Sequence, residues 1–131
     1  MISKYAIKTE HTMYTIFRIV VGLLFAMHGM QKLGWIGSGN MATGLFLAVG
    51  IGETLVGLAI LLGFLVRHAA LGGVIIMVGA QIMSHLPKGI WPLFNGGEAS
   101  MLFLVAFLVI FAMGPGKLLS LEKALFKKEL C

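Results

Sequence analysis

The segment TGLFLAVGIGETLVGLAILLGFLV, residues 43–66, runs for 24 residues with a single charge, at Glu53. A helix needs about 20 apolar residues to cross the roughly 30 Å hydrocarbon core of a bilayer. Three further segments, residues 19–31, 69–86 and 99–113, contain no Asp, Glu, Lys or Arg. The sequence therefore predicts several helices that span a membrane.

The composition of the whole chain supports this interpretation. Of its 131 residues, 59% are hydrophobic and only 11% are charged, and the mean hydropathy is +0.99. An ordinary soluble domain has about 25% charged residues, so a soluble monomer and a disordered chain are both excluded. The only cysteine is Cys131, which excludes a disulfide within the chain and a paired-cysteine redox motif.

We expect a single all-α integral membrane domain over residues 1–131, built as a four-helix bundle. Its spans are predicted at residues 12–33, 43–66, 69–86 and 98–113, after a tail of about ten residues. We expect a tight turn at Arg67 and His68, and Pro87 should end the third span. Pairs of small residues, such as Ala48 with Gly52, should let the helices approach closely.

The end of the chain has a different pattern. Leu118, Leu121 and Leu125 recur at helical spacing, with lysines on the other faces. This pattern is typical of an amphipathic helix that lies on an anionic membrane surface. We predict such an interfacial helix over residues 117–130.

Positive charge is distributed unevenly between the two ends of the predicted bundle. Eight of the ten lysines and arginines lie near the termini or at the 67–68 turn, and only Lys32 and Lys88 border the two long loops. The positive-inside rule then places both termini in the cytoplasm and the protein in the cell membrane. Arg18 is expected to snorkel to the surface. The residues assigned to topology and to the membrane surface are Arg18, Arg67, Lys123, Lys127 and Lys128.

The remaining polar side chains within the spans are candidates for a functional site, because polar groups are costly in a bilayer. His28, Gln31 and Lys32 share one helix face, as do Gln81 and His85. We expect a polar pocket in the outer half of the bundle, reaching down to Glu53. The predicted catalytic residues are Glu53, His28 and Lys32, and the predicted ligand-binding residues are Gln81, His85, Asn95, Glu98 and Gln31. Interhelical hydrogen bonding is the structural alternative.

Metal and nucleotide sites receive little support from the sequence. The four residues His28, His85, Glu53 and Glu98 suit zinc or iron by type, but they lack a short ligand motif, so we expect neither a metal nor a haem. No phosphate-binding loop is present. The net charge of +5 is accounted for by the predicted cytoplasmic face, and we expect no nucleic-acid partner.

An ordered set of motifs resembles the DoxX family. They are HGMQK at residues 28–32, NGGE at 95–98, GPG at 114–116 and SLE at 120–122. The family commonly has Asp where Glu122 stands here. The resemblance implies a small four-helix membrane protein. It also implies a link to thiosulfate:quinone oxidoreductases, or to redox complexes that contain a sulfurtransferase and a superoxide dismutase.

Three functions are compatible with these observations. The first is a quinone-binding or small-molecule-binding subunit of a membrane redox complex, in which electrons come from a bound partner or cofactor. The second is a membrane anchor for a soluble redox enzyme at the cytoplasmic face. The third is a small-molecule permease, which Arg18 disfavours because no other polar side chain lies in the inner half of a span. Small residues on the helix faces also favour self-association.

Overall fold

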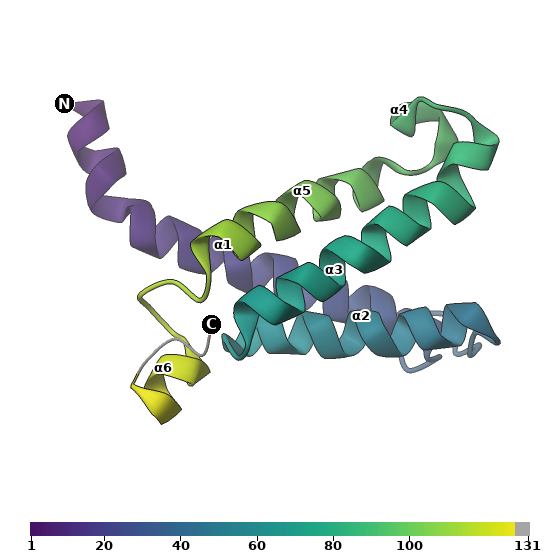
Figure 1. Ribbon diagram of the computed structural model, residues 1–131, viewed down its shortest axis with the longest axis horizontal. Helices are drawn as coiled ribbons and strands as arrows, with labels where there is room; N and C mark the ends of the chain where they lie inside the picture. Colours follow the sequence, from purple (N-terminus) through teal and green to yellow (C-terminus); the bar gives the residue numbers. More distant parts are fainter. Residues whose placement is uncertain (128–131) are drawn as a thin grey trace.

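The computed structural model describes residues 1–127, and this part of the chain contains helices and no strands. Four longer helices form the body of the protein, and Figure 1 shows their order. The elements are α1 (Ile2–Lys32), α2 (Leu45–Leu62), α3 (Val66–Ala80), the π-helix η1 (Gln81–His85), the 3-10 helix η2 (Leu86–Lys88), α4 (Pro92–Asn95), α5 (Glu98–Met113) and α6 (Leu121–Phe126).

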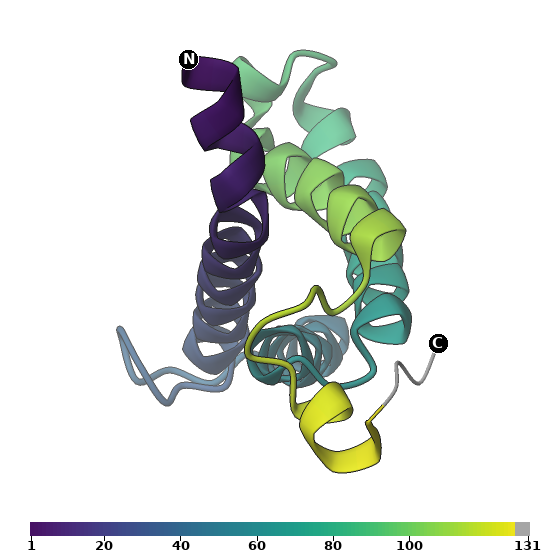
Figure 2. The ribbon, with the colours of Figure 1, turned by 90° about the vertical axis from the view of Figure 1, so that its left-hand side faces the viewer.

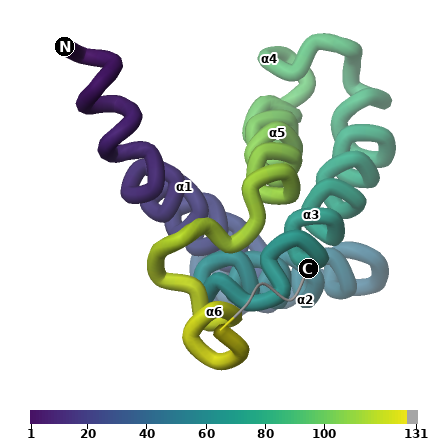
Figure 3. The backbone as a smooth tube through the Cα atoms, turned by 60° about the vertical axis from the view of Figure 1, so that its left-hand side comes forward, coloured from purple at the N-terminus to yellow at the C-terminus, as the bar shows by residue number. Residues whose placement is uncertain are grey.

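The direction of the chain alternates through α1, α2, α3 and α5. The two long connections, residues 33–44 and 86–97, lie at one end of the bundle, which we call the loop end (Figure 1). The short turn at residues 63–65 lies at the other end, together with residues 114–127 (Figure 3). We call this second end the basic end, because Arg18, Arg67 and Lys117 lie at or near it.

Three helices are long and apolar enough to cross a membrane by length and composition. They are α1, α2 and the continuous helix Val66–Lys88 that contains α3, η1 and η2. Helix α5 is equally apolar but has only 16 residues. The prediction of an all-helical membrane protein is therefore confirmed, with three helices of spanning length among the described residues.

The closest helix contact in the bundle joins α1 to α2. A Cβ added at Gly57 would lie 2.7 Å from the Cα of Ala26 and from the carbonyl oxygen of Gly22. Such approaches require glycine, because lipid supplies no hydrophobic force between spans and association depends on close packing. The expected pair Ala48 and Gly52 does not form this contact, since Ala48 is exposed.

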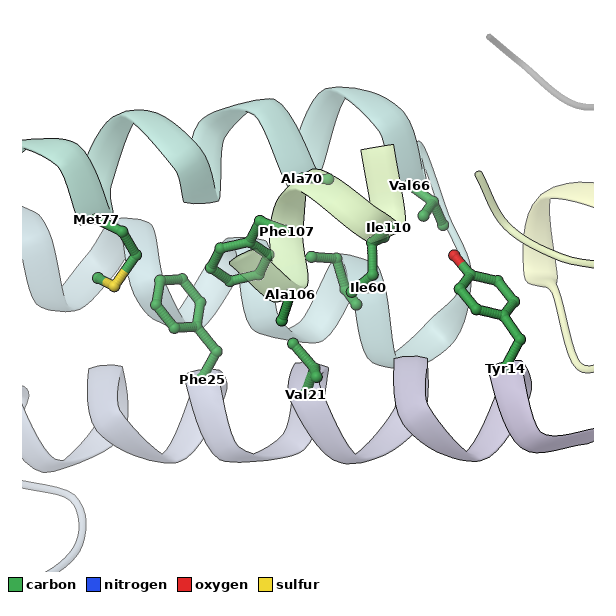
Figure 4. Close-up of a cluster of buried hydrophobic side chains, with 10 residues drawn as sticks. All are labelled: Tyr14, Val21, Phe25, Ile60, Val66, Ala70, Met77, Ala106, Phe107 and Ile110. Atoms are coloured by element: carbon green, nitrogen blue, oxygen red, sulfur yellow. The ribbon is translucent and has the colours of Figure 1, made fainter. Parts of the chain in front are cut away.

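An apolar core fills the space between the four longer helices (Figure 4). At its centre, the rings of Phe25 and Phe107 meet edge to face with centroids 4.6 Å apart. Ile60 and Ile110 are fully buried beside them. Most other large apolar side chains are exposed, as expected for helices whose outer faces contact lipid.

Two of the predicted boundaries are wrong. Helix α1 starts at Ile2 and not at about residue 12, because residues 2–21 contain no glycine or proline to interrupt it. Helix α2 ends at Leu62, where Gly63 adopts the left-handed conformation at φ 73° that typically ends a helix. The turn is therefore at residues 63–65, and Arg67 lies in the first turn of α3.

The third span also ends differently from the prediction. Pro87 does not stop the helix at Leu86, and the chain instead passes through one π-helical turn and one 3-10 turn. Proline has no N–H to donate to the carbonyl one turn earlier, so the α-helical hydrogen-bonding pattern cannot continue. The amide of Leu86 bonds to the carbonyl of Gln81 and widens the helix at this point.

The predicted interfacial helix over residues 117–130 is not observed in the described residues. Helix α6 has six residues, begins after the cap Ser120, and buries the side chain of Glu122 completely. Residues 117–120 are not helical, because Ser120 and the segment before it bind to the bundle. Residues 128–130 of the predicted helix, including Lys128, lie outside the described residues.

Candidate functional site

An ion pair joins α1 to α2 near the loop end. The Nζ of Lys32 lies 2.7 Å from Oε2 of Glu53, and the side chains are 29% and 5% exposed respectively. The pair forms because α1 and α2 approach closely here, where a Cβ on Gly50 would lie 2.8 Å from the Cβ of Lys32. The lysine thus compensates a carboxylate that is almost fully removed from solvent.

A hollow of about 260 Å³ lies on the neighbouring face of α1. His28 and Gln31 supply its polar side chains, and both are exposed. Its apolar walls come from Leu24, Met27 and Ile36, and Gly37 completes the lining. The positive φ of Gly37, 80°, turns the loop back beside the Gln31 side chain.

The imidazole of His28 is held by an aromatic contact. Its ring stands edge-on to Phe103 of α5, with centroids 5.5 Å apart and an interplanar angle of 89°. This contact fixes the ring while its exposed edge remains accessible. We call the hollow and its two polar side chains the His28 hollow.

A second hollow, of about 370 Å³, lies between the end of α1, the following loop and α2. It is almost wholly apolar, and Thr54 is its only lining residue with a hydroxyl. Its lining residues are Leu33, Trp35, Met41, Leu47, Ile51, Thr54 and Leu55.

The other predicted ligand-binding residues form a separate group between η1 and the start of α5. Gln81 donates to the carbonyl of Gly97 at 2.8 Å. Asn95 donates to the carbonyl of Gly89 and accepts from the amide of Gly97, both at 2.8 Å. His85 Nδ1 lies 3.3 Å from the carbonyl oxygen of Asn95. All of these bonds involve the backbone, so this group organises the loop end.

The structure therefore divides the predicted pocket into two parts. Lys32 and Glu53 pair with each other beside the His28 hollow, whereas Gln81, His85 and Asn95 bind the loop. Within residues 1–127, no hydrogen bond or ion pair joins the two groups. Glu98 is exposed in the first turn of α5. The binding and catalytic roles of these residues stay predictions.

The basic end contains a second set of polar contacts that the sequence analysis missed. The guanidinium of Arg18 is fully buried and donates to the carbonyls of Ile60 at 2.7 Å and Leu119 at 2.5 Å. The expectation that Arg18 snorkels to a surface is wrong. The carbonyl of Ile60 also accepts from the amide of Gly63 at the end of α2, so Arg18 donates a second hydrogen bond to it.

Further contacts bind residues 111–122 to the bundle. Tyr14 donates to the carbonyl of Gly114 at 2.5 Å. Arg67 donates to the carbonyls of Phe111 and Ala112, so it caps α5 in addition to carrying charge. Ser120 Oγ and the amide of Glu122 both bond to the carbonyl of Gly63 at 3.0 Å. We call residues 114–120 the strap.

The signal for the strap was present in the sequence as the GPG and SLE motifs. Gly114 and Gly116 both have positive φ angles, and a Cβ on Gly114 would lie 2.9 Å from the Arg67 guanidinium. Lys123 follows as part of α6, and its amide is capped by Ser120. Lys127 is exposed with a positive φ of 54°.

The chemical groups at the loop end limit the kinds of ligand that could bind there. Among the described residues, no group of three or more His, Cys, Asp and Glu side chains could hold a metal ion. Imidazole and amide groups in an apolar hollow are suited to a flat ligand with carbonyl acceptors.

Comparison with known proteins agrees with the resemblance seen in the motifs. A protein of Haemophilus influenzae described as uncharacterized is 31% identical, over 85% of this chain and 89% of its own length. An uncharacterized membrane protein of Mycobacterium tuberculosis is 29% identical, over 85% of this chain and 80% of its own length. No solved structure matches the chain. The sequence profile of the DoxX family matches residues 13–86, and the chain is a member of the DoxX family of membrane proteins.

Proposed function

We propose that this protein is the quinone-binding subunit of a membrane redox complex, and that the His28 hollow binds the quinone headgroup. The observation that carries the proposal is the pairing of two exposed hydrogen-bonding side chains, His28 and Gln31, with apolar walls in one hollow. Inside a bilayer, polar groups that are not used for packing mark binding sites. Neither side chain has a protein hydrogen-bond partner among the described residues.

The chemistry of a quinone headgroup fits this hollow. It is a flat ring with two carbonyl oxygens. The imidazole of His28 and the amide of Gln31 can each donate a hydrogen bond to one of these oxygens. An isoprenoid tail would follow the exposed apolar side chains Leu24 and Val20 along α1 into the lipid. A bound quinone supplies the capacity to accept two electrons and two protons.

The Lys32–Glu53 pair has the residue types needed to hold or move a proton near the hollow. Lys32 lies one helical turn after His28, and its ammonium group donates to the carboxylate of Glu53 at 2.7 Å. The sequence contains no paired cysteines, so the proposal takes its electrons from a bound partner or cofactor.

The proposal includes a membrane orientation with four spans. Helix α5 packs along α3, so the bilayer that α3 crosses also surrounds α5. The basic end carries Arg67, Lys117 and Lys127, whereas the loop end carries Lys32 and Lys88. This asymmetry places the basic end and both termini in the cytoplasm, and the His28 hollow at the outer leaflet.

Quinone binding in lipid nanodiscs tests the proposal. A short-chain ubiquinone should bind the native protein, and His28→Phe or Gln31→Leu should each weaken binding about fivefold, because each removes one hydrogen bond worth about 1 kcal/mol. His11→Phe, which changes the same residue type in the same helix but far from the hollow, is the matched control.

Unchanged affinity in both hollow variants would contradict the quinone proposal. The role of a membrane anchor for a soluble enzyme would then be favoured. Helix α6 supports that second role, because it is docked at the outside of the basic end (Figure 2) and exposes Leu125 and Phe126. Removal of residues 121–131 should in that case release a soluble enzyme from membranes, whereas His28→Phe should not.

A further inference from the structure

Helix α1 is longer than the membrane core it crosses. Its 31 residues correspond to about 46 Å at 1.5 Å per residue, against about 30 Å of hydrocarbon. Its buried side chains begin at Tyr14, and residues 1–10 are all exposed. These first turns extend past the other helices (Figure 1), on the opposite side of the basic end from α6 (Figure 2).

One side of these first turns continues the lipid-facing surface of the bundle. The exposed apolar side chains of α1 recur every three or four residues from Met27 back to Ile2, with Thr9 as the one polar position among them. This apolar strip contains Ile2, Tyr5, Ala6, Met13, Ile16, Phe17, Val20, Leu24 and Met27. Thr9 lies on the same strip, and its hydroxyl is bonded to the carbonyl of Tyr5, which makes it compatible with lipid.

The other side of the same turns is basic. Five residues follow one another at steps of three and four and therefore share one face of the helix. They are Lys4, Lys8 and His11, followed by the buried residues Thr15 and Arg18. Within the bundle this face is buried, and beyond it the two lysines are exposed. His11 lies 3.5 Å from Glu10, whereas the ammonium groups of Lys4 and Lys8 form no ion pair with another described residue.

We propose that residues 2–11 form an interfacial segment that binds anionic phospholipids. The apolar strip enters the acyl region as a direct continuation of the lipid-facing surface of α1, and Lys4 and Lys8 hold lipid phosphates. An apolar face opposite a lysine face is the signature of helices that lie in the membrane interface. A tilt of α1 accommodates its excess length and keeps the apolar strip in contact with lipid.

Spin labels at two adjacent positions test the proposal in the full-length protein. In a Cys131→Ser background, Ala6→Cys places a label on the apolar strip and Ile7→Cys places one about 100° around the helix. In nanodiscs of three parts phosphatidylcholine and one part phosphatidylglycerol, the label at 6 should be accessible to oxygen from the lipid. The label at 7 should be accessible to a water-soluble nickel reagent.

The headgroup contact is tested by the double variant Lys4→Gln/Lys8→Gln. Its preference for phosphatidylglycerol, measured by the lipid retained on the purified protein, should fall about thirty-fold, since each lysine near an anionic surface contributes about 1 kcal/mol. Lys88→Gln at the loop end is the matched control and should change nothing.

Two results would overturn the proposal. One is equal nickel accessibility at positions 6 and 7 in every lipid mixture, which would mean that the helix extends into water. The other is an unchanged lipid preference in the double lysine variant. An unchanged melting temperature and helical circular dichroism of the same variants show that they are folded. Because the His28 hollow lies at the opposite end of α1, failure of either proposal leaves the other standing.

Discussion

Lys32 and Glu53 are two charged side chains whose interaction is fixed by the glycines beside them. The carboxylate is almost inaccessible to solvent, and the ammonium is the only cation bonded to it among the described residues. Removing one member leaves the other charge poorly solvated, whereas replacing both can be nearly neutral. Comparing single and double substitutions of this pair can therefore separate its effect on stability from its effect on function.

Single and double substitutions should differ in a defined way. Lys32→Met should lower the free energy of unfolding by about 3 kcal/mol, because Glu53 would be left buried without a partner. The double variant Lys32→Met/Glu53→Leu should recover most of this loss in a thermal unfolding assay. If the pair serves proton transfer, the double variant should still bind quinone but should not support quinone reduction by the redox complex. A rate of quinone reduction equal to that of the native protein would show that the pair has only a structural role.

Arg18 is the residue for which sequence reasoning failed most clearly. A lone arginine near the end of a span is usually able to reach the surface, and nothing in the local sequence shows that carbonyls from α2 and the strap will surround it. Its partners, Ile60 and Leu119, are 42 and 101 residues away. Only the folded chain brings these groups together.

The α1–α2 contact makes a prediction at the level of the helix pair. Gly57→Ala should destabilise the protein by about 2 kcal/mol, because the new methyl group would meet the backbone of Ala26 and overpacking typically costs about 1–3 kcal/mol. Gly79→Ala is the matched control, since no atom lies within 4 Å of its added Cβ, and it should stabilise α3 by about 0.5–1 kcal/mol. Equal melting temperatures for the two variants would contradict the packing argument.

The positions of the helices along the sequence were largely predictable, but the side of each helix that packs against a neighbour was not. Hydropathy located all four longer helices, and α5 coincides with the expected residues 98–113. With 18 glycines, however, spacing alone cannot decide which ones face a neighbouring helix. Ala48 was expected at an interface and is exposed, whereas Gly57, which has the same kind of neighbours in sequence, is buried.

The candidate site was predictable only in part, for a similar reason. Helical spacing placed His28 and Gln31 on a shared face, and both line one hollow. It could not show that Gln81 and Asn95 bond to the backbone of the loop end. Long-range backbone partners leave no periodic signal in a sequence.

The whole molecule has a charge asymmetry that predicts its orientation in the cell membrane. In a Cys131→Ser background, Ser38→Cys at the loop end should react with a membrane-impermeant maleimide in intact cells. Lys117→Cys at the basic end should react only after the cells are lysed, since lysine-rich ends stay in the cytoplasm. The opposite labelling pattern would invert the orientation, and with it the assignment of the His28 hollow to the outer leaflet.

The strap has a consequence for how freely this region can change over evolutionary time. Backbone carbonyl oxygens of residues 111–119 accept hydrogen bonds from the side chains of Tyr14, Arg67 and Arg18. Every amino acid supplies the same backbone carbonyl group. Substitutions at Leu118 or Leu119, whose side chains are exposed, should thus accumulate at little cost. Inserting or deleting a single residue there would instead move the carbonyl of Leu119 away from Arg18 and the hydroxyl of Ser120 away from the carbonyl of Gly63, so the length of this stretch should change far less than its composition.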